Sequence, residues 1–271
     1  MKRKLILSIV FILMLNVLHA QNQINGSVLN KKSNLPVEYV NIGIVGKNIG
    51  TVSDKDGKFS LLIEPQYAKD SLIFSRIGFE SHSVKISELK ENNIVHLKEK
   101  SYSLNKVTVT PAIFKERVFG ITSESKLIVL GFGNNALGYE CGLLMKNKKK
   151  AIIKSVNINF LPSTCDTIFC RLNIYEVKEK NIFENILIES IYVGISKENI
   201  LKGSLHLDLK EKNIIVNGDF LVTLEQITGL CGESLYFPTS LKQKTYYRET
   251  SQGNWETISV GISLSVIADV Y

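Results

Sequence analysis

Three histidines and several carboxylates in the mature part of the chain are of types that bind metal ions. His96 and Glu99 form an H-x-x-E pair, and His206 lies downstream as a third candidate ligand. Zinc ligands must converge on one point. His96 falls in a run that alternates like a β-strand, where residues i and i+3 face opposite sides. We therefore expect no zinc site at this pair.

A second carboxylate motif, Asp54-Lys55-Asp56-Gly57, has the first residues of a calcium loop. It lacks the third Asp or Asn and the bidentate Glu of an EF-hand. A hairpin turn explains the motif, because Asp side chains bond to turn backbone and Gly adopts positive φ. The chain also has no G-x-S-x-G, P-loop, G-x-G-x-x-G or H-E-x-x-H motif. We predict no catalytic residue, no metal site and no cofactor, and hence no enzyme.

Aromatic residues and one arginine gather near the C-terminus. The candidate ligand-binding residues are Tyr236, Tyr246, Tyr247, Arg248 and Trp255. Carbohydrate-binding sandwiches use such rings because an aromatic face offers apolar area with a polar edge. Packing is the alternative, since Tyr246 and Tyr247 would face opposite sides of a strand and Trp255 would cover a hairpin.

The elements that must position these residues follow a period of two from Lys126 onward. Half-buried strands alternate in this way. Four runs show the pattern most clearly: Val156 to Phe160, Ile168 to Ile174, Leu205 to Leu209 and Phe220 to Leu224. Gly and Asn stand between the runs, as at Asn217-Gly218, and no long amphipathic helix is predicted. The second half is predicted to be an antiparallel sandwich of the jelly-roll or immunoglobulin-like kind.

The first hundred residues also alternate, with turns at regular intervals. The characteristic pieces are Ile24-Asn25-Gly26-Ser27-Val28, Asn34-Leu35-Pro36-Val37, Val40 to Ile44, Gly50 to Phe59, Ser75 to Phe79 and Asn93 to Leu97. In this order they resemble the carboxypeptidase-like regulatory domain, a transthyretin-like or immunoglobulin-like β-sandwich of envelope proteins of the Bacteroidetes type. The chain is therefore predicted to be all-β, with two β-sandwich domains.

The resemblance implies an accessory domain rather than a catalytic one. In TonB-dependent receptors that carry it, a segment similar to Leu104 to Pro111 leads into the plug and barrel. Here we expect that segment to be a last strand and linker that could add to the edge of a partner's sheet. The runs Arg171 to Tyr175 and Tyr247 to Trp255 resemble an uncharacterised region found behind this domain. The predicted segments are 1–20 signal peptide, 21–100 regulatory sandwich, 101–125 TonB-box-like linker and 126–271 C-terminal sandwich.

The N-terminus predicts export. Lys2-Arg3-Lys4, the apolar run Leu5 to Leu15 and small residues up to Ala20 form the three regions of a signal peptide. Without its three basic residues, the 33 in the chain fall to 30, against 26 acidic ones. The only dense basic cluster, Lys146 to Lys150, is typical of a hairpin tip. We expect the periplasm or cell surface, no nucleic acid and no stable membrane span.

Four cysteines, Cys141, Cys165, Cys170 and Cys231, remain after cleavage of the signal peptide. Their even number in an oxidising compartment suggests disulfides, with three pairings. Cys165 and Cys170 could close a short loop, which would leave Cys141 to meet Cys231. Buried free thiols are the alternative.

Two functions remain from the sequence. The preferred one is a non-enzymatic interaction module that binds an outer-membrane or other envelope protein through loops or a strand edge. The alternative is a carbohydrate-binding accessory protein that uses the C-terminal aromatic residues on a glycan.

Overall fold

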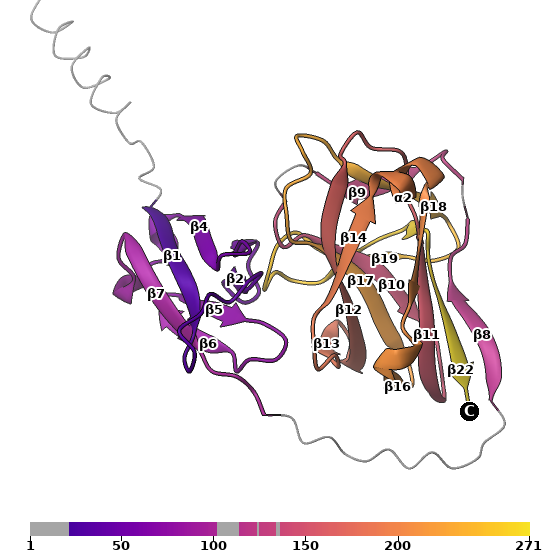
Figure 1. Ribbon diagram of the computed structural model, residues 1–271, viewed down its shortest axis with the longest axis horizontal. Coiled ribbons are helices and arrows are strands. Elements are labelled where there is room, and N and C mark those ends of the chain that lie inside the picture. Colours follow the sequence, from indigo (N-terminus) through magenta and orange to yellow (C-terminus); the bar gives the residue numbers. More distant parts are fainter. Residues whose placement is uncertain (1–21, 102–113, 124, 134–135) are drawn as a thin grey trace, which may run out of the picture.

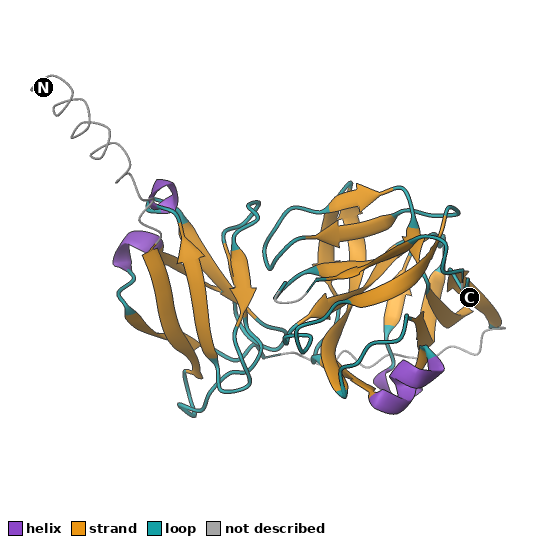
Figure 2. Cartoon of the chain, turned by 90° about the horizontal axis from the view of Figure 1, so that it is seen from above, coloured by secondary structure: helices purple, strands orange, loops and turns teal. Residues whose placement is uncertain are grey.

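The computed structural model describes residues 22–101, 114–123, 125–133 and 136–271. Almost all regular structure in these ranges is β-strand, in two bodies with separate hydrophobic cores (Figures 1 and 2). The prediction of an all-β sandwich fold is confirmed. The predicted signal peptide over 1–20 and the segment Leu104 to Pro111 lie outside the described residues. In the described part of the chain, no helix has the length and apolar character needed to span a membrane.

The body formed by residues 22–101, here called the N-terminal sandwich, consists of two sheets. Their strands are β1 (Asn22–Asn30), β2 (Asn41–Gly43), β3 (Gly50–Val52), β4 (Lys58–Ile63), β5 (Ser71–Ser75), β6 (His82–Lys85) and β7 (Asn92–Leu97). One sheet has the order β4-β1-β7 and the other β3-β2-β5-β6. Strands β1 and β7 pair in parallel, and the remaining pairs are antiparallel. Short 3-10 helices η1 (Pro65–Tyr67) and η2 (Ile86–Glu88) connect strands.

The core of the N-terminal sandwich follows from strand alternation. Phe59, Leu61 and Ile63 of β4 are buried between exposed neighbours. Phe59 meets Phe74 of the other sheet edge to face, with ring centroids 5.5 Å apart. Each such buried side chain contributes roughly 1.5–3 kcal/mol relative to exposure.

The motif at Asp54 forms a turn rather than a cation loop. The Asp54 carboxylate accepts hydrogen bonds from the backbone N–H groups of Asp56 and Lys58, at 2.9 and 2.8 Å. Gly57 adopts φ +72°, and a Cβ there would lie 2.6 Å from the Val28 carbonyl oxygen. Only glycine fits this position without displacing the backbone.

Residues 114–271 form the C-terminal sandwich. Its strands are β8 (Lys115–Gly120), β9 (Val129–Phe132), β10 (Glu140–Met145), β11 (Lys150–Asn159), β12 (Thr167–Glu179), β13 (Ile182–Asn185), β14 (Ile191–Ser196), β15 (Ser204–Asp208), β16 (Ile215–Asn217), β17 (Phe220–Gln226), β18 (Leu235–Ser240), β19 (Thr245–Arg248), β20 (Glu256–Ile258), β21 (Gly261–Ile262) and β22 (Leu264–Val270). A seven-stranded sheet has the order β13-β12-β17-β10-β19-β20, with β14 also on β12. A five-stranded sheet has the order β15-β11-β22-β8, with β16 on β11, and a smaller sheet has the order β21-β18-β9.

Strand β8 lies inside the stretch predicted as a linker. It pairs with β22 from Val270↔Lys115 to Ser265↔Gly120 and forms an edge of the five-stranded sheet. Short helices interrupt the strands at α2 (Lys197–Lys202) and η3 (Lys210–Lys212). Helix α2 begins with a capping box at Ser196 and ends at Gly203, which adopts the left-handed conformation.

The cysteine pairing differs from the suggested Cys165–Cys170 and Cys141–Cys231 bridges. Cys165 forms a disulfide with Cys231, while Cys141 and Cys170 are buried free thiols. Cys170 belongs to the inward face of β12 and Cys141 to that of β10, so both side chains lie in the core. Cys165 precedes β12 in a loop and can therefore reach the loop after β17.

Candidate functional site

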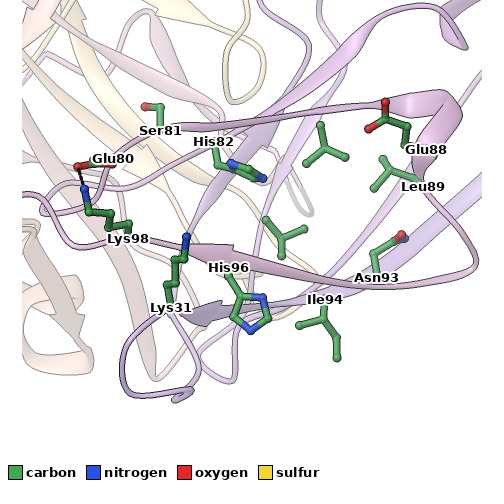
Figure 3. Close-up of a pocket in the computed structure, with 12 residues that line it drawn as sticks. Lys31, Glu80, Ser81, His82, Glu88, Leu89, Asn93, Ile94, His96 and Lys98 are labelled. Carbon is green, nitrogen blue, oxygen red and sulfur yellow. Dashed lines mark hydrogen bonds and ion pairs between the residues drawn. The ribbon is translucent and has the colours of Figure 1, made fainter.

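A groove of about 780 Å³ runs between strands β6 and β7 of the N-terminal sandwich (Figure 3). Strand β6 is the last strand of one sheet, and β7 is the last strand of the other. The groove therefore lies where the two layers of the sandwich end side by side. Each edge strand has backbone N–H and C=O groups that point away from its sheet.

The lining of the groove is mostly polar, with a smaller apolar part. Val84 of β6 and Leu89 after η2 are half-buried, and Val95 of β7 is buried. Ile94 stands at the rim with 67% of its surface exposed. An extended peptide could therefore bury alternate apolar side chains here while its backbone bonds to a strand edge.

The two ends of the groove differ. At one end the chain closes it, because Phe79 and Glu99 form a β-bridge and the Glu80 N–H donates to the Lys98 carbonyl oxygen at 2.8 Å. Lys98 also forms an ion pair with the Glu80 carboxylate at 2.8 Å. At the other end, Figure 3 shows Glu88, Leu89 and Asn93.

Asn93 fixes the turn that leads into β7. Its amide nitrogen donates to the carbonyl oxygens of Asn25 and Lys90, at 2.9 and 2.7 Å, and its amide oxygen accepts from the Lys90 N–H. These hydrogen bonds hold the turn before β7 and attach it to β1 at this end of the groove.

His96 of the H-x-x-E motif lines this groove, but its side chain does not converge with that of Glu99. His96 Nε2 lies 3.3 Å from Asn34 Oδ1, whereas the Glu99 carboxylate accepts a hydrogen bond from Asn30. His206 is in the other sandwich, next to Asn157. Within the described ranges, no cluster of three His, Cys, Asp or Glu side chains could hold a metal ion.

The structure divides the predicted aromatic site into three parts. Trp255 packs edge to face on Tyr175 and Phe183, with centroid distances of 5.7 and 5.3 Å. Tyr246 packs on the same Phe183 at 5.6 Å. Phe183, which joins Tyr246 and Trp255, was not among the residues predicted from the sequence.

Tyr247 points to the opposite face from Tyr246. Its ring stacks on Tyr139 at 6.1 Å, and its hydroxyl donates to the Glu256 carboxylate. Tyr236 lies on β18 in another sheet, with 44% of its surface exposed. The five predicted residues therefore do not form one binding surface.

Arg248 belongs to a buried polar cluster rather than to a free aromatic face. Its guanidinium bonds to the Glu140 carboxylate at 2.6 and 2.8 Å and lies over the Trp255 ring. Glu140 also accepts from Asn173 and Tyr175, at 2.9 and 2.8 Å, and from Thr223. Burial, together with the charge of Glu140, raises the pKa of Tyr175 well above its usual value.

The cluster continues to a second buried ion pair. Asn173 donates from one amide nitrogen to both Glu140 and Glu225, and Arg171 donates to Glu225 from Nε and Nη2. Arg171 and Glu225 are 2% and 0% exposed. Two arginines thus balance two glutamates on the outer face of the seven-stranded sheet.

The N-terminal sandwich covers this face. Arg171 Nη1 donates to the Tyr39 carbonyl oxygen at 2.8 Å, and Nη2 donates to Asn41. Tyr39 and Tyr192 pack edge to face at 5.2 Å, and Gln252 donates to Ser75 at 2.7 Å. The alternation of Arg171 and Asn173 with apolar residues identified a polar face, but nothing in it identified what covers that face.

Comparison with known proteins identifies the first sandwich. Residues 24–109 match the model of the CarboxypepD_reg-like domain. The TonB-dependent receptor P39 of Formosa agariphila is 34% identical over 106 residues, which cover 36% of this chain and 10% of the receptor. The chain thus spans about a tenth of the length of this curated relative.

Structural likenesses are weak. The structure of infectious bursal disease virus Gt strain aligns at 8% identity and a TM-score of 0.22, over 91% of this chain and 63% of the viral one. The T13 particle of the same virus aligns at 9% identity and a TM-score of 0.24, over 92% of this chain and 62% of the viral one. Such scores carry no argument about function. The family match and the receptor confirm the predicted resemblance, because residues 24–109 match the CarboxypepD_reg-like domain and the receptor aligns over 36% of this chain.

Proposed function

We propose that this chain is a non-enzymatic module of the cell envelope that binds an extended segment of an envelope protein in the β6–β7 groove. A CarboxypepD_reg-like domain, which also matches a TonB-dependent receptor, points to an envelope-associated module. The domain family is non-catalytic. We extend that absence of catalysis to the whole chain and place it in the periplasm or at the cell surface.

The observation that carries the proposal is the pair of sheet edges, β6 and β7, on either side of a partly apolar groove. A bound strand would pair with β6 or β7, and its inward side chains would contact the accessible apolar residues Val84, Leu89 and Ile94. Main-chain hydrogen bonds would supply affinity, and the difference between the Glu80–Lys98 ion pair at one end and the Glu88 carboxylate at the other would fix direction.

The junction with the C-terminal sandwich supports the same role. The Arg171 contacts with Tyr39 and Asn41 lie away from the groove, which is lined by N-terminal residues alone. The second sandwich can therefore hold the first one without occupying its binding edge.

Site-specific photo-crosslinking in envelope extracts tests the proposal. A crosslinker at Ile94, on the groove rim, is expected to capture one envelope protein at a single extended segment. The control is Leu62 of β4, which is 57% exposed at the other edge of the same sheet. A synthetic peptide of the captured segment should then bind the wild type and bind Ile94→Asp at least about tenfold more weakly.

Two results would contradict the proposal. Equal capture from Ile94 and Leu62 would show that the groove is not selective. Peptide binding that Ile94→Asp leaves unchanged would place the contact elsewhere.

Carbohydrate binding is the second candidate. Phe183, Tyr246 and Trp255 form a half-buried aromatic group on one face of the seven-stranded sheet. Selective retention of the protein on a polysaccharide column, lost in Tyr246→Ala without a change in melting temperature, would support this function over protein binding.

A further inference from the structure

Large apolar side chains stand exposed at one end of the C-terminal sandwich. Leu127 and Leu241 are 94% and 77% exposed, more than any other large hydrophobic residue in the described part of the chain. Ile128, Val129 and Tyr236 are also exposed. An exposed group of this kind is unusual on a protein surface that has no partner.

These residues are neighbours because β9 and β18 pair. Val129 lies opposite Pro238, and both the N–H and the hydroxyl of Thr239 donate to the Ile128 carbonyl oxygen. Continued by one residue, the same register places Leu127 opposite Ser240, which is next to Leu241 in the following turn. We call Leu127, Val129, Tyr236 and Leu241 the apolar tip.

Lysines flank the apolar tip, both before β9 and after β18. Lys126 precedes Leu127, and Lys242 and Lys244 follow Leu241. All three are exposed, and none forms an ion pair within the described ranges. By contrast, Lys197 and Lys202 of helix α2 are paired with carboxylates.

We infer that the apolar tip docks on an anionic lipid surface. Leucine side chains can enter the boundary between headgroups and acyl chains, while lysines remain among anionic headgroups. Protein interfaces are depleted in lysine, so exposed leucines flanked in the sequence by lysines without ion pairs fit a lipid surface better than a protein one. Each lysine near such a surface strengthens binding by about fivefold.

Vesicle flotation tests the inference on residues 21–271, which keep every described residue and omit the predicted signal peptide. The chain should float with vesicles of mixed phosphatidylcholine and phosphatidylglycerol and much less with phosphatidylcholine alone. Leu127→Ser combined with Leu241→Ser should weaken binding at least about tenfold, because apolar burial is lost. Lys242→Gln combined with Lys244→Gln should weaken it by about tenfold or more and reduce its salt dependence.

The matched control is Leu35→Ser, an equally conservative change at a leucine 64% exposed on the N-terminal sandwich. It should float like the wild type, and all variants should keep the wild-type melting temperature. The inference is overturned if the wild type does not float with anionic vesicles or if the tip variants float unchanged. It is also overturned if sedimentation shows instead a dimer that the leucine changes dissolve, because the tip would then be a protein contact.

Discussion

Arg171 donates two hydrogen bonds to a single oxygen of Glu225, from Nε at 3.0 Å and from Nη2 at 2.8 Å, and both side chains are almost fully buried. The same guanidinium reaches the backbone of Tyr39 in the N-terminal sandwich. One arginine thus completes a buried ion pair and joins two separate cores.

Removal of one partner from this pair should be costly. We expect Arg171→Met to lower the free energy of unfolding by about 3–5 kcal/mol, because Glu225 would stay buried without its counter-charge. The double variant Arg171→Met with Glu225→Met should lose less than Arg171→Met alone. Urea denaturation followed by fluorescence measures both changes.

Lys178→Met is the control for this pair, because its contacts with Glu176 and Glu184 are solvent-exposed. Lys178→Met should lower the free energy of unfolding by less than about 1 kcal/mol. A loss of the same size in Arg171→Met and Lys178→Met would refute the argument from burial.

The Cys165–Cys231 disulfide should stabilise the C-terminal sandwich. It closes a loop with a sequence separation of 66 residues. Chain-entropy arguments give about 4 kcal/mol for a loop of this size. The expected result is a lower melting temperature for Cys165→Ser than for the wild type, and no further fall when reductant is added to the variant. A reductant effect of equal size in both proteins would mean that another bond is responsible.

The remaining thiols should be inert in the folded protein. Burial raises the pKa of the Cys170 thiol to about 12 and that of Cys141 well above its usual value. Maleimide should label neither cysteine at pH 8 until denaturant is added, since only the thiolate reacts. Mass spectrometry of native and unfolded samples checks this, and labelling of the native protein would contradict it.

The raised pKa of Cys170 makes the stability of the folded protein depend on pH. The folded pKa of Cys170 lies above its ordinary value of 9.0. Its neutral form therefore favours folding fully below pH 9, and this contribution is lost as the pH rises toward 12. Cys170→Ala should flatten the fall in stability over that window relative to the wild type in urea titrations.

Trp255 should act mainly in packing. Trp255 is half-buried against Tyr175, Phe183 and Arg248. Trp255→Ala is therefore expected to lower the free energy of unfolding by about 2–3 kcal/mol, less than the same substitution at a fully buried Trp. Tyr236→Ala, at an exposed position, should change stability by less than about 0.5 kcal/mol. If Trp255→Ala keeps full stability and loses glycan retention, the ring is a binding surface instead.

Strand alternation explains why so much of the fold could be read in advance. Val156, Ile158 and Phe160 were predicted to share an inward face, and all three are buried in the core. The turn at Asp54 and the opposite directions of Tyr246 and Tyr247 followed from the same local geometry. These features depend only on residues that are close together in the sequence, so they can be predicted from it.

The pairing of cysteines could not be read in the same way. Cys165 lies five residues from Cys170, yet its partner is Cys231, because strand direction sends Cys170 into the core and leaves Cys165 in a loop. The candidate site could not be predicted from the sequence either. The β6–β7 groove depends on which strands end each sheet, and the order of strands is a long-range property.

The sequence by itself therefore determined the β-strand alternation, the polar and apolar faces and the similarity of the N-terminal sandwich to its family. Only the tertiary structure decided that Arg171 and Glu225 are buried, because the face they share is polar and its cover comes from Tyr39, more than a hundred positions earlier. It also decided which edges stay open and which leucines stand exposed. Alternation along a strand is a local steric rule, whereas burial and pairing depend on contacts between segments that the chain order does not specify.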